Sequence, residues 1–189
     1  MAFSRLLLVP CLLALSLTGC GFQLRGQAQI SDALEPIALQ CNERMPQELC
    51  RTVKNQLELR DIQLAEPEDA AHVLRLENFR EERRASAITQ QASAAEFDLR
   101  QSLSMSVITS DSLPLIADTQ LSTRDTYRYD ETNVLAKRRE EQEIRSGLYQ
   151  RLAEQIIFRL APLTGERIES LRSAAAAAAE TEADRDETP

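Results

Sequence analysis

The chain has 189 residues, and 30 acidic against 22 basic side chains give it a formal net charge of −8. This acidic balance argues against a nucleic-acid-binding protein, and against broad attraction to an anionic membrane surface, because both ligands are negatively charged. It leaves room for a local basic patch, which can capture an anionic ligand even on an acidic protein.

The N-terminal segment has the features of an export signal. An almost unbroken apolar run from Leu6 to Leu17 follows Arg5. A bilayer-spanning helix needs about 20 apolar residues, so this run of about a dozen fits the core of a signal peptide instead. The sequence "LTGC" that ends at Cys20 resembles a bacterial lipobox, whose cysteine becomes the acylated first residue. We therefore predict that residues 1–19 are cleaved and that Cys20 is lipidated; a plain secretory signal that ends beside a cysteine is the alternative.

The lipid on Cys20 would decide the location of the protein. Two or three acyl chains make membrane attachment effectively permanent. Gly21 stands where the inner-membrane retention signal of lipoproteins would place Asp. The resemblance to lipoproteins therefore implies delivery to the outer membrane, with the lipid in the inner leaflet and the body facing the periplasm. Residues 20–33 are polar and fit a tether between the lipid and the folded domain.

Two cysteines are left for the mature domain. Cys11 is lost with the signal peptide, so Cys41 and Cys50 remain beside Cys20. An exported compartment permits disulfides, and closing a loop of about ten residues stabilises by roughly 2 to 3 kcal/mol in the chain-entropy model. We predict a Cys41–Cys50 disulfide; two buried free cysteines are the alternative. The one histidine, His72, is too far away in sequence to support a metal site with them.

The first predicted elements are a strand and a helix. Residues 35–41 (EPIALQC) have the composition of a short strand. A helix is expected from Pro46 to about Arg60, since proline is harmless in a first turn. Its apolar stripe recurs every four residues at Leu49, Val53 and Leu57.

Three predicted strands follow. Residues 72–91 are strand-like but alternate poorly and carry many Arg and Glu residues, which indicates a strand that runs past the core. From Phe97 the sequence alternates as in a half-buried strand. Phe97, Leu99, Leu103, Met105 and Val107 point one way, and Asp98, Arg100, Ser102, Ser104 and Ser106 point the other. Residues 109–112 (TSDS) have turn chemistry, and residues 115–129 are again extended. We expect the three strands to form an antiparallel meander.

A second helix is predicted over residues 136–160, and Pro162 ends it. Its apolar stripe also recurs every four residues, at Ile144, Leu148, Leu152, Ile156 and Leu160. Residues 166–189 are acidic and rich in alanine, too poor in apolar side chains to offset the cost of ordering, so we expect a mobile tail or a frayed helix. Residues 34–165 then form a single domain.

This order of elements predicts the fold class. Two amphipathic helices with one apolar stripe each need one apolar sheet face. We expect an α+β protein, a two-layer sandwich with both helices on one face of a four-stranded, mostly antiparallel sheet. The other face stays open to solvent or to a partner.

The sequence favours binding over catalysis. A single histidine and five glycines offer no nucleophilic triad and no phosphate loop, and no cofactor is expected. Two basic clusters remain: Arg80, Arg83 and Arg84 on the second strand, and Lys137, Arg138 and Arg139 at the start of the last helix. If they meet at one end of the sandwich, they form a cationic surface for phosphates. Solvated charges paired with the neighbouring glutamates are the alternative.

Five fragments resemble the LptE family of lipopolysaccharide-assembly lipoproteins. The most specific is "GCGFQLRG" at residues 19–26. The others are "VKNQL" at 53–57, "AEF" at 95–97, "LAK" at 135–137 and "AEQI" at 153–156. The resemblance implies the same two-helix, four-strand sandwich, acting as a plug inside the LptD β-barrel, helping that barrel assemble and binding lipopolysaccharide for insertion into the outer leaflet.

The resemblance also suggests which residues bind lipopolysaccharide. Lys137 lies in a fragment that the family shares and is the first candidate for phosphate contact, followed by Arg138, Arg83 and Arg84. Two rival readings stay open: a tethered periplasmic enzyme or inhibitor, which requires a concave site, and a structural lipoprotein with another envelope partner.

Overall fold

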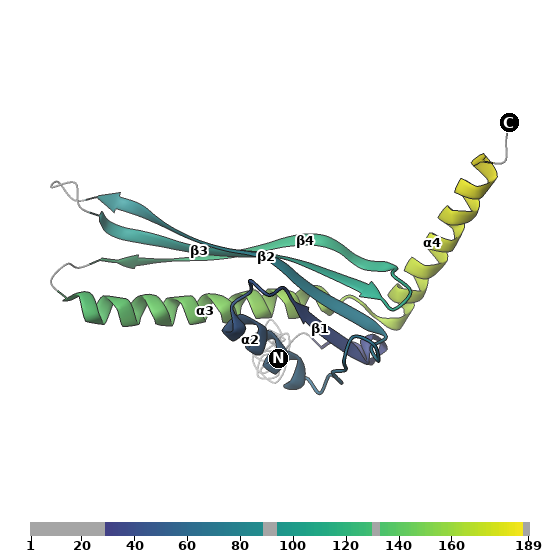
Figure 1. Cartoon of the computed structure of the whole chain (residues 1–189), viewed down its shortest axis with the longest axis horizontal. Helices are drawn as coiled ribbons and strands as arrows, with labels where there is room; N and C mark the ends of the chain where they lie inside the picture. Colours follow the sequence, from purple (N-terminus) through teal and green to yellow (C-terminus); the bar gives the residue numbers. More distant parts are fainter. Residues whose placement is uncertain (1–28, 89–93, 130–132, 187–189) are drawn as a thin grey trace, which may run out of the picture.

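The computed structural model describes residues 29–88, 94–129 and 133–186. Figure 1 labels most of the elements along the chain. In chain order they are η1 (Asp32–Leu34), β1 (Ile37–Cys41), α2 (Gln47–Glu58), β2 (His72–Ile88), β3 (Ala94–Thr109), β4 (Pro114–Arg128), α3 (Val134–Leu160) and α4 (Gly165–Asp186).

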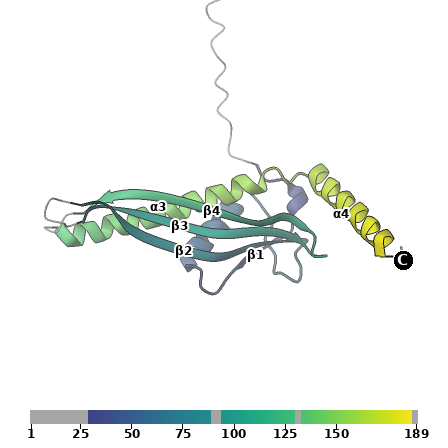
Figure 2. The same cartoon turned by 90° about the horizontal axis from the view of Figure 1, so that it is seen from above.

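The four strands form one sheet in the order β1-β2-β3-β4. β1 runs parallel to β2, and the pairs β2–β3 and β3–β4 are antiparallel. The parallel pair requires a crossover, and α2 provides it. α2 and α3 lie on the same face of the sheet, whereas no described helix covers the other face (Figures 1 and 2). The predicted α+β sandwich is therefore confirmed.

The main core lies where α2, α3 and the sheet meet. The predicted stripe of α2 is fully buried at Leu49, Val53 and Leu57. α3 adds Leu152, Ile156 and Leu160, and the sheet contributes residues that include Leu76, Leu103 and Met105. The two four-residue periodicities therefore identified the faces that the helices bury.

The phase of β2 changes in the middle of the strand. Glu77 pairs with Ser104 and Arg80 with Ser102, so two residues of β2 stand opposite Leu103. These are Asn78, whose φ is 54°, and Phe79. Such a β-bulge reverses which side chains face the core, and asparagine tolerates a positive φ better than most residues. Leu74 and Leu76 face the helices before the bulge, whereas Glu81, Arg83 and Ala85 do so after it.

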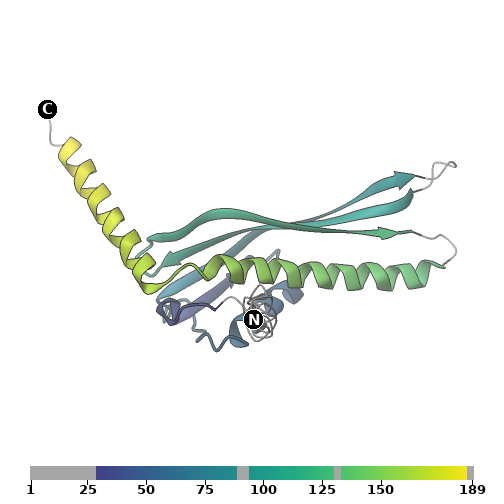
Figure 3. The same ribbon diagram turned by 180° about the vertical axis from the view of Figure 1, so that it is seen from behind.

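Beyond the bulge the sheet continues past α2 and packs against the first half of α3 alone (Figures 1 and 3). A second, smaller apolar cluster forms there from Leu99, Tyr127 and Leu148, with Phe97 and Ile144 partly buried against it. This matches the prediction that the strand beginning at residue 72 runs past the main core. We call this part of the molecule the distal end.

The disulfide ties the sheet edge to the first helix. It joins Cys41, the last residue of β1, to Cys50 in α2, and their Cα atoms are 6.4 Å apart. That separation lies within the range that a disulfide bridges.

Helix α4 occupies most of the segment for which a mobile tail or a frayed helix is expected. It continues to Asp186 and projects away from the sheet (Figures 1 and 3). Only its beginning packs against the domain: Ile168 is buried, and Leu171 contacts the main core. Among the described residues, no helix combines the length and the hydrophobicity needed to cross a membrane.

His72 is buried where β2 begins. Its Nδ1 lies 3.1 Å from the carbonyl oxygen of Leu34, to which it donates as an N–H, and its Nε2 has no partner among the described residues. Burial lowers the pKa of His72 below the ordinary value of 6.5; the Leu34 hydrogen bond opposes this, Arg172 adds to the lowering and Asp111 opposes it weakly. Protonation would place a buried N–H at Nε2 without an acceptor there.

The pH dependence of stability follows from this lowered pKa. Above pH 6.5 both folded and unfolded chains hold neutral His72; as pH falls, the unfolded chain takes up a proton first. The free energy of unfolding should therefore fall from pH 6.5 toward the lowered pKa, by at most about 1.4 kcal/mol per pH unit. Urea unfolding between pH 7.5 and 5.5 measures this. His72→Gln removes the only imidazole and should flatten the profile; equal slopes in both proteins would refute the assignment.

Candidate functional site

The bulge decides which of two neighbouring arginines of β2 faces the helices. Arg83 pairs with Leu99, which is fully buried under α3, whereas Arg84 pairs with Asp98 on the open face. Directly paired residues share a face of the sheet. Arg83 therefore lies on the helix side, and Arg84 on the open side, where it forms an exposed ion pair with Glu82 at 2.8 Å.

Aromatic rings hold the Arg83 guanidinium. Its Cζ lies 3.6 Å from the ring centroid of Phe97, and its Nε donates to Tyr127 Oη at 2.6 Å. The two rings stack on each other at 5.8 Å between centroids. A cation over an aromatic face is stabilised by the ring quadrupole. The hydrogen bond to Tyr127 uses one of the five N–H donors of the guanidinium. Most of the donors of Arg83 are therefore not needed to hold the group in position.

Glu141 of α3 joins this arrangement from the helix side. It accepts a hydrogen bond from Tyr127 Oη at 2.6 Å, and its carboxylate lies 3.6 Å from Arg83 Nε. Burial raises the pKa of Tyr127, and the neighbouring carboxylate of Glu141 adds to the increase. The phenol therefore stays protonated and keeps donating to Glu141 near neutral pH.

Arg145 extends the network one turn further along α3. Its Nε lies 2.9 Å from Glu81 Oε1 of β2, and its Nη2 lies 3.0 Å from Glu141 Oε1. The two carboxylates raise the pKa of Arg145 even though burial opposes it. Gln101 of β3 donates to Glu81 at 2.8 Å from a fully buried position. These side chains attach the first half of α3 to the sheet through charges as well as apolar contacts.

Gln101 is a residue that the sequence reasoning missed. The alternation of β3 predicted an apolar face with Phe97, Leu99, Leu103 and Met105. Gln101 lies between them and points to the same face. A polar residue at a position that should be buried indicates that a polar partner lies nearby, because a buried amide needs hydrogen bonds. That signal was present in the pattern.

A pocket at the distal end collects three of the predicted cations. It has a volume of about 200 Å³ and lies between the ends of β2, β4 and α3. Its lining residues are Arg83, Tyr127, Tyr129, Val134, Lys137, Arg138 and Glu141. Lys137 pairs with Glu140 on its own helix at 2.6 Å. The two predicted basic clusters thus meet through Arg83, Lys137 and Arg138.

The other predicted cations lie elsewhere. Arg84 is on the open face, and Arg80 lines a different pocket with residues 42–45. Arg139 is exposed on α3 and does not line the distal pocket. Cys20 lies outside the described residues.

The start of α3 adds two features to the pocket. Asn133 caps the helix, since its side-chain oxygen accepts a hydrogen bond from the amide of Ala136 at 3.4 Å. The N-terminal end of a helix dipole favours an anion. Apolar side chains are also exposed at the distal end. Val134, which lines the pocket, is 40% exposed, and Leu135 and Ile88, which do not line it, are 76% and 70% exposed. Cations beside exposed apolar groups suit an amphiphilic anion better than a small inorganic one.

Among the described residues, no group of three or more His, Cys, Asp or Glu side chains is placed to hold a metal ion. The arrangement at the distal end combines three cations and the carboxylate of Glu141 with one helix terminus and exposed apolar side chains.

Comparison with known families identifies the chain. The family model described as "LptE: Lipopolysaccharide-assembly" matches residues 33–160. The chain belongs to the LptE family. Membership ties it to lipopolysaccharide transport and outer-membrane assembly, in a family of non-enzymatic lipoproteins. The comparison with curated proteins returned no match.

Solved structures with this fold come from other bacterial lipoproteins. Rare lipoprotein B from Shewanella oneidensis is 22% identical, with a TM-score of 0.58 over 67% of this chain and 93% of that chain. A minor lipoprotein from Acinetobacter baumannii is 20% identical, with a TM-score of 0.56 over 67% and 90%. Uncharacterized lipoprotein B from Nitrosomonas europaea is 15% identical, with a TM-score of 0.60 over 73% and 88%. At these identities the likeness shows that the LptE fold is shared.

Glu141→Gln tests whether the charge network holds α3 to the sheet. It keeps the size of the side chain but removes the charge that faces Arg83 and Arg145. We expect the free energy of unfolding to fall by about 1 to 3 kcal/mol, because partly buried cations lose their partner. The matched control is Glu140→Gln, which breaks only the pair with Lys137 on the same helix and should cost less than about 1 kcal/mol. Equal losses in urea unfolding would show that the network does not hold the helix.

Proposed function

We propose that this LptE-family chain is a non-catalytic outer-membrane lipoprotein that occupies the LptD β-barrel and binds lipopolysaccharide at its distal end. The observation that carries the proposal is the meeting of Arg83, Lys137 and Arg138 around one pocket. These cations come from elements separated by about 50 residues in sequence, so the fold brings them together.

A phosphate group is the ligand that this pocket fits best. Arg83 presents a planar fork of donors that matches phosphate oxygens, and Phe97 and Tyr127 already fix its plane. Because the guanidinium is held in place before binding, less conformational entropy is lost when the anion arrives. Lys137 supplies a point charge on a flexible stem and exchanges Glu140 for the ligand.

Exposed apolar side chains at the distal end suit an amphiphilic ligand. Ile88 and Leu135 expose most of their surface at the end of the molecule that carries the cations. A lipid whose phosphates bind to the pocket would bring its acyl chains near these residues. Competition for the phosphates of aggregated lipopolysaccharide would then separate single molecules for insertion into the outer leaflet.

The open face of the sheet supports the role as a plug. Its polar side chains pair with each other across the strands, as Arg75 does with Gln40, Arg100 with Ser122, and Thr126 with Asp98. The lumen of an outer-membrane barrel is polar and hydrated. A face whose polar groups are already paired can enter such a lumen without leaving charges unsatisfied.

Charge reversal tests lipopolysaccharide binding. Lys137→Glu with Arg83→Glu should weaken binding of purified lipopolysaccharide about tenfold or more, since charge-assisted bonds to phosphate are lost. Lys137→Glu with Arg138→Glu makes the same change while leaving Arg83 and Glu141 intact, in case the first pair unfolds the distal end. Binding is measured on the mature lipoprotein, and circular dichroism checks that each variant is folded.

The matched control is Arg80→Glu with Arg139→Glu, which removes the same charge outside the pocket and should leave binding within about twofold. Arg84→Glu alone tests whether the open face of the sheet contributes to lipopolysaccharide binding; a loss of affinity would show that it does. Unchanged binding in both pocket variants would remove the lipopolysaccharide site from the proposal.

Copurification tests the partner and the anchor. Affinity purification of the full lipoprotein from outer membranes should recover LptD as its dominant β-barrel companion. Mass spectrometry of the mature N-terminus should find an acylated Cys20. Cys20→Ala should lose the acyl chains and with them the attachment to the outer membrane, because acyl chains on this residue are the proposed anchor. A companion other than LptD, or an unmodified thiol at Cys20, would contradict this part of the proposal.

A further inference from the structure

The outer edge of β1 is only partly paired. The amide of Ile37 donates to the carbonyl of Gln63 at 3.0 Å, and the amide of Ala65 donates to the carbonyl of Ile37 at 3.1 Å. The backbone N–H and C=O groups of consecutive residues in a strand point to opposite sides, so those of every second residue share a side. The N–H and C=O groups of Leu39 and Cys41 therefore point to the same outer side as those of Ile37, and neither residue has a backbone partner on that side among the described residues.

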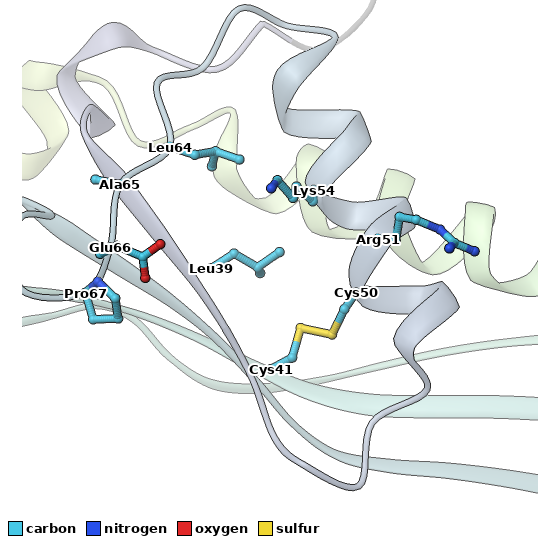
Figure 4. Close-up of a pocket in the computed structure, with 9 residues that line it drawn as sticks. All are labelled: Leu39, Cys41, Cys50, Arg51, Lys54, Leu64, Ala65, Glu66 and Pro67. Carbon is cyan, nitrogen blue, oxygen red and sulfur yellow. A yellow bond between two sulfur atoms is a disulfide. The ribbon is translucent and has the colours of Figure 1, made fainter.

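The segment that pairs with Ile37 cannot continue along the edge. Leu64 forms a single parallel bridge with Ile37, and Pro67, which follows closely, has no N–H to donate. The edge beyond Ile37 therefore opens onto a groove of about 660 Å³. Figure 4 shows this groove between β1, α2 and the segment of residues 64–67.

The groove has an apolar base and unlike charges on its walls. Leu39, Leu64 and the Cys41–Cys50 disulfide form the apolar part, and α2 contributes Arg51 and Lys54 (Figure 4). Lys54 pairs with Glu58 at 3.8 Å, and both side chains are more than half exposed. An exposed pair of this kind contributes little, so Lys54 can exchange Glu58 for another carboxylate. The wall opposite α2 carries Glu66.

We propose that this groove binds an extended segment of a partner protein, which adds to β1 as a fifth strand and directs an acidic side chain toward Arg51 and Lys54. A peptide backbone both donates and accepts hydrogen bonds, as the outward N–H and C=O groups of Leu39 and Cys41 require. Side chains of the added strand alternate between the groove and the open face of the sheet. Only every second side chain of the partner therefore contacts the groove. This proposal does not depend on lipopolysaccharide binding at the distal end.

Two other occupants fit less well. In a symmetric dimer through two β1 edges, the Arg51 and Lys54 pairs of both copies would approach each other, and like charges repel. An anionic lipid would satisfy Arg51 and Lys54, but its headgroup phosphate cannot donate to the carbonyl of Leu39. The free edge is also short, since β1 ends at Cys41. A footprint of a few residues indicates weak, reversible binding.

Amide hydrogen exchange of the mature lipoprotein tests the proposal directly. The probe is a capped hexapeptide that alternates valine and aspartate. On binding, exchange at the amides of Leu39 and Cys41 should slow, whereas the amides of Ala38 and Gln40, already paired to β2, should not change. Absence of slowing at millimolar peptide would overturn the proposal.

Two altered peptides separate strand addition from other binding. A peptide of the same sequence with alternate amides N-methylated keeps its charge but cannot complete the ladder, and it should not bind. A peptide with lysine in place of aspartate should bind at least threefold more weakly, because it meets Arg51 and Lys54. If the N-methylated peptide binds as well as the original, backbone pairing to β1 is refuted. If the lysine peptide does, recognition of an acidic side chain is refuted.

Charge reversal in the groove completes the test. Arg51→Glu with Lys54→Glu should weaken the acidic peptide about three- to tenfold, whereas Arg159→Glu on the exposed side of α3 should have no effect. Vesicles containing anionic phospholipid probe the competing occupant. If they slow exchange at Leu39 and Cys41 as the acidic peptide does, a lipid is the occupant and the proposal is wrong.

Discussion

The distal end of this molecule depends on one extra residue in β2. The bulge at Asn78 and Phe79 reverses the phase of the strand, so that Glu81 and Arg83 face α3 while Glu82 and Arg84 face outward. Without it, the last part of β2 would turn its other side chains toward the helix. The contacts of Arg83 with Phe97 and Tyr127, and of Glu81 with Arg145, then would not form. The meeting of the two basic clusters is a consequence of this shift in phase.

The two ends of the sandwich are held together by different interactions. Around α2 the core is almost entirely apolar and is joined to the sheet edge by the disulfide. Around the first half of α3 a small apolar cluster shares the interior with Gln101, Glu81 and Arg145. A polar interior fixes side chains in specific positions, because each buried group needs its partner. The side chains held in this way lie at the distal end, where ligand binding is proposed.

Much of the fold could be predicted from the sequence, because apolar periodicity records burial. The stripes of α2 and α3 and the alternation of β3 identified the two layers, and the spacing of Cys41 and Cys50 suggested their pairing. Which face of the sheet Arg83 and Arg84 occupy could not be predicted. A bulge is visible in a sequence as a shift in apolar alternation, and this stretch consists mostly of Arg and Glu. Gln101 was missed because it interrupts an apolar face. Helix α4 formed beyond the predicted domain because Ile168 and Leu171 anchor its start.

The division of the interior has a consequence for motion. Regions with few apolar contacts open locally at a lower free energy than the rest of a protein. The strand ends around Arg83 and Tyr127 can therefore separate from α3 in a sub-global fluctuation while the layer under α2 stays intact. Such a molecule would keep its disulfide-linked end closed while the distal end, whose side chains are well placed when it is closed, opens first.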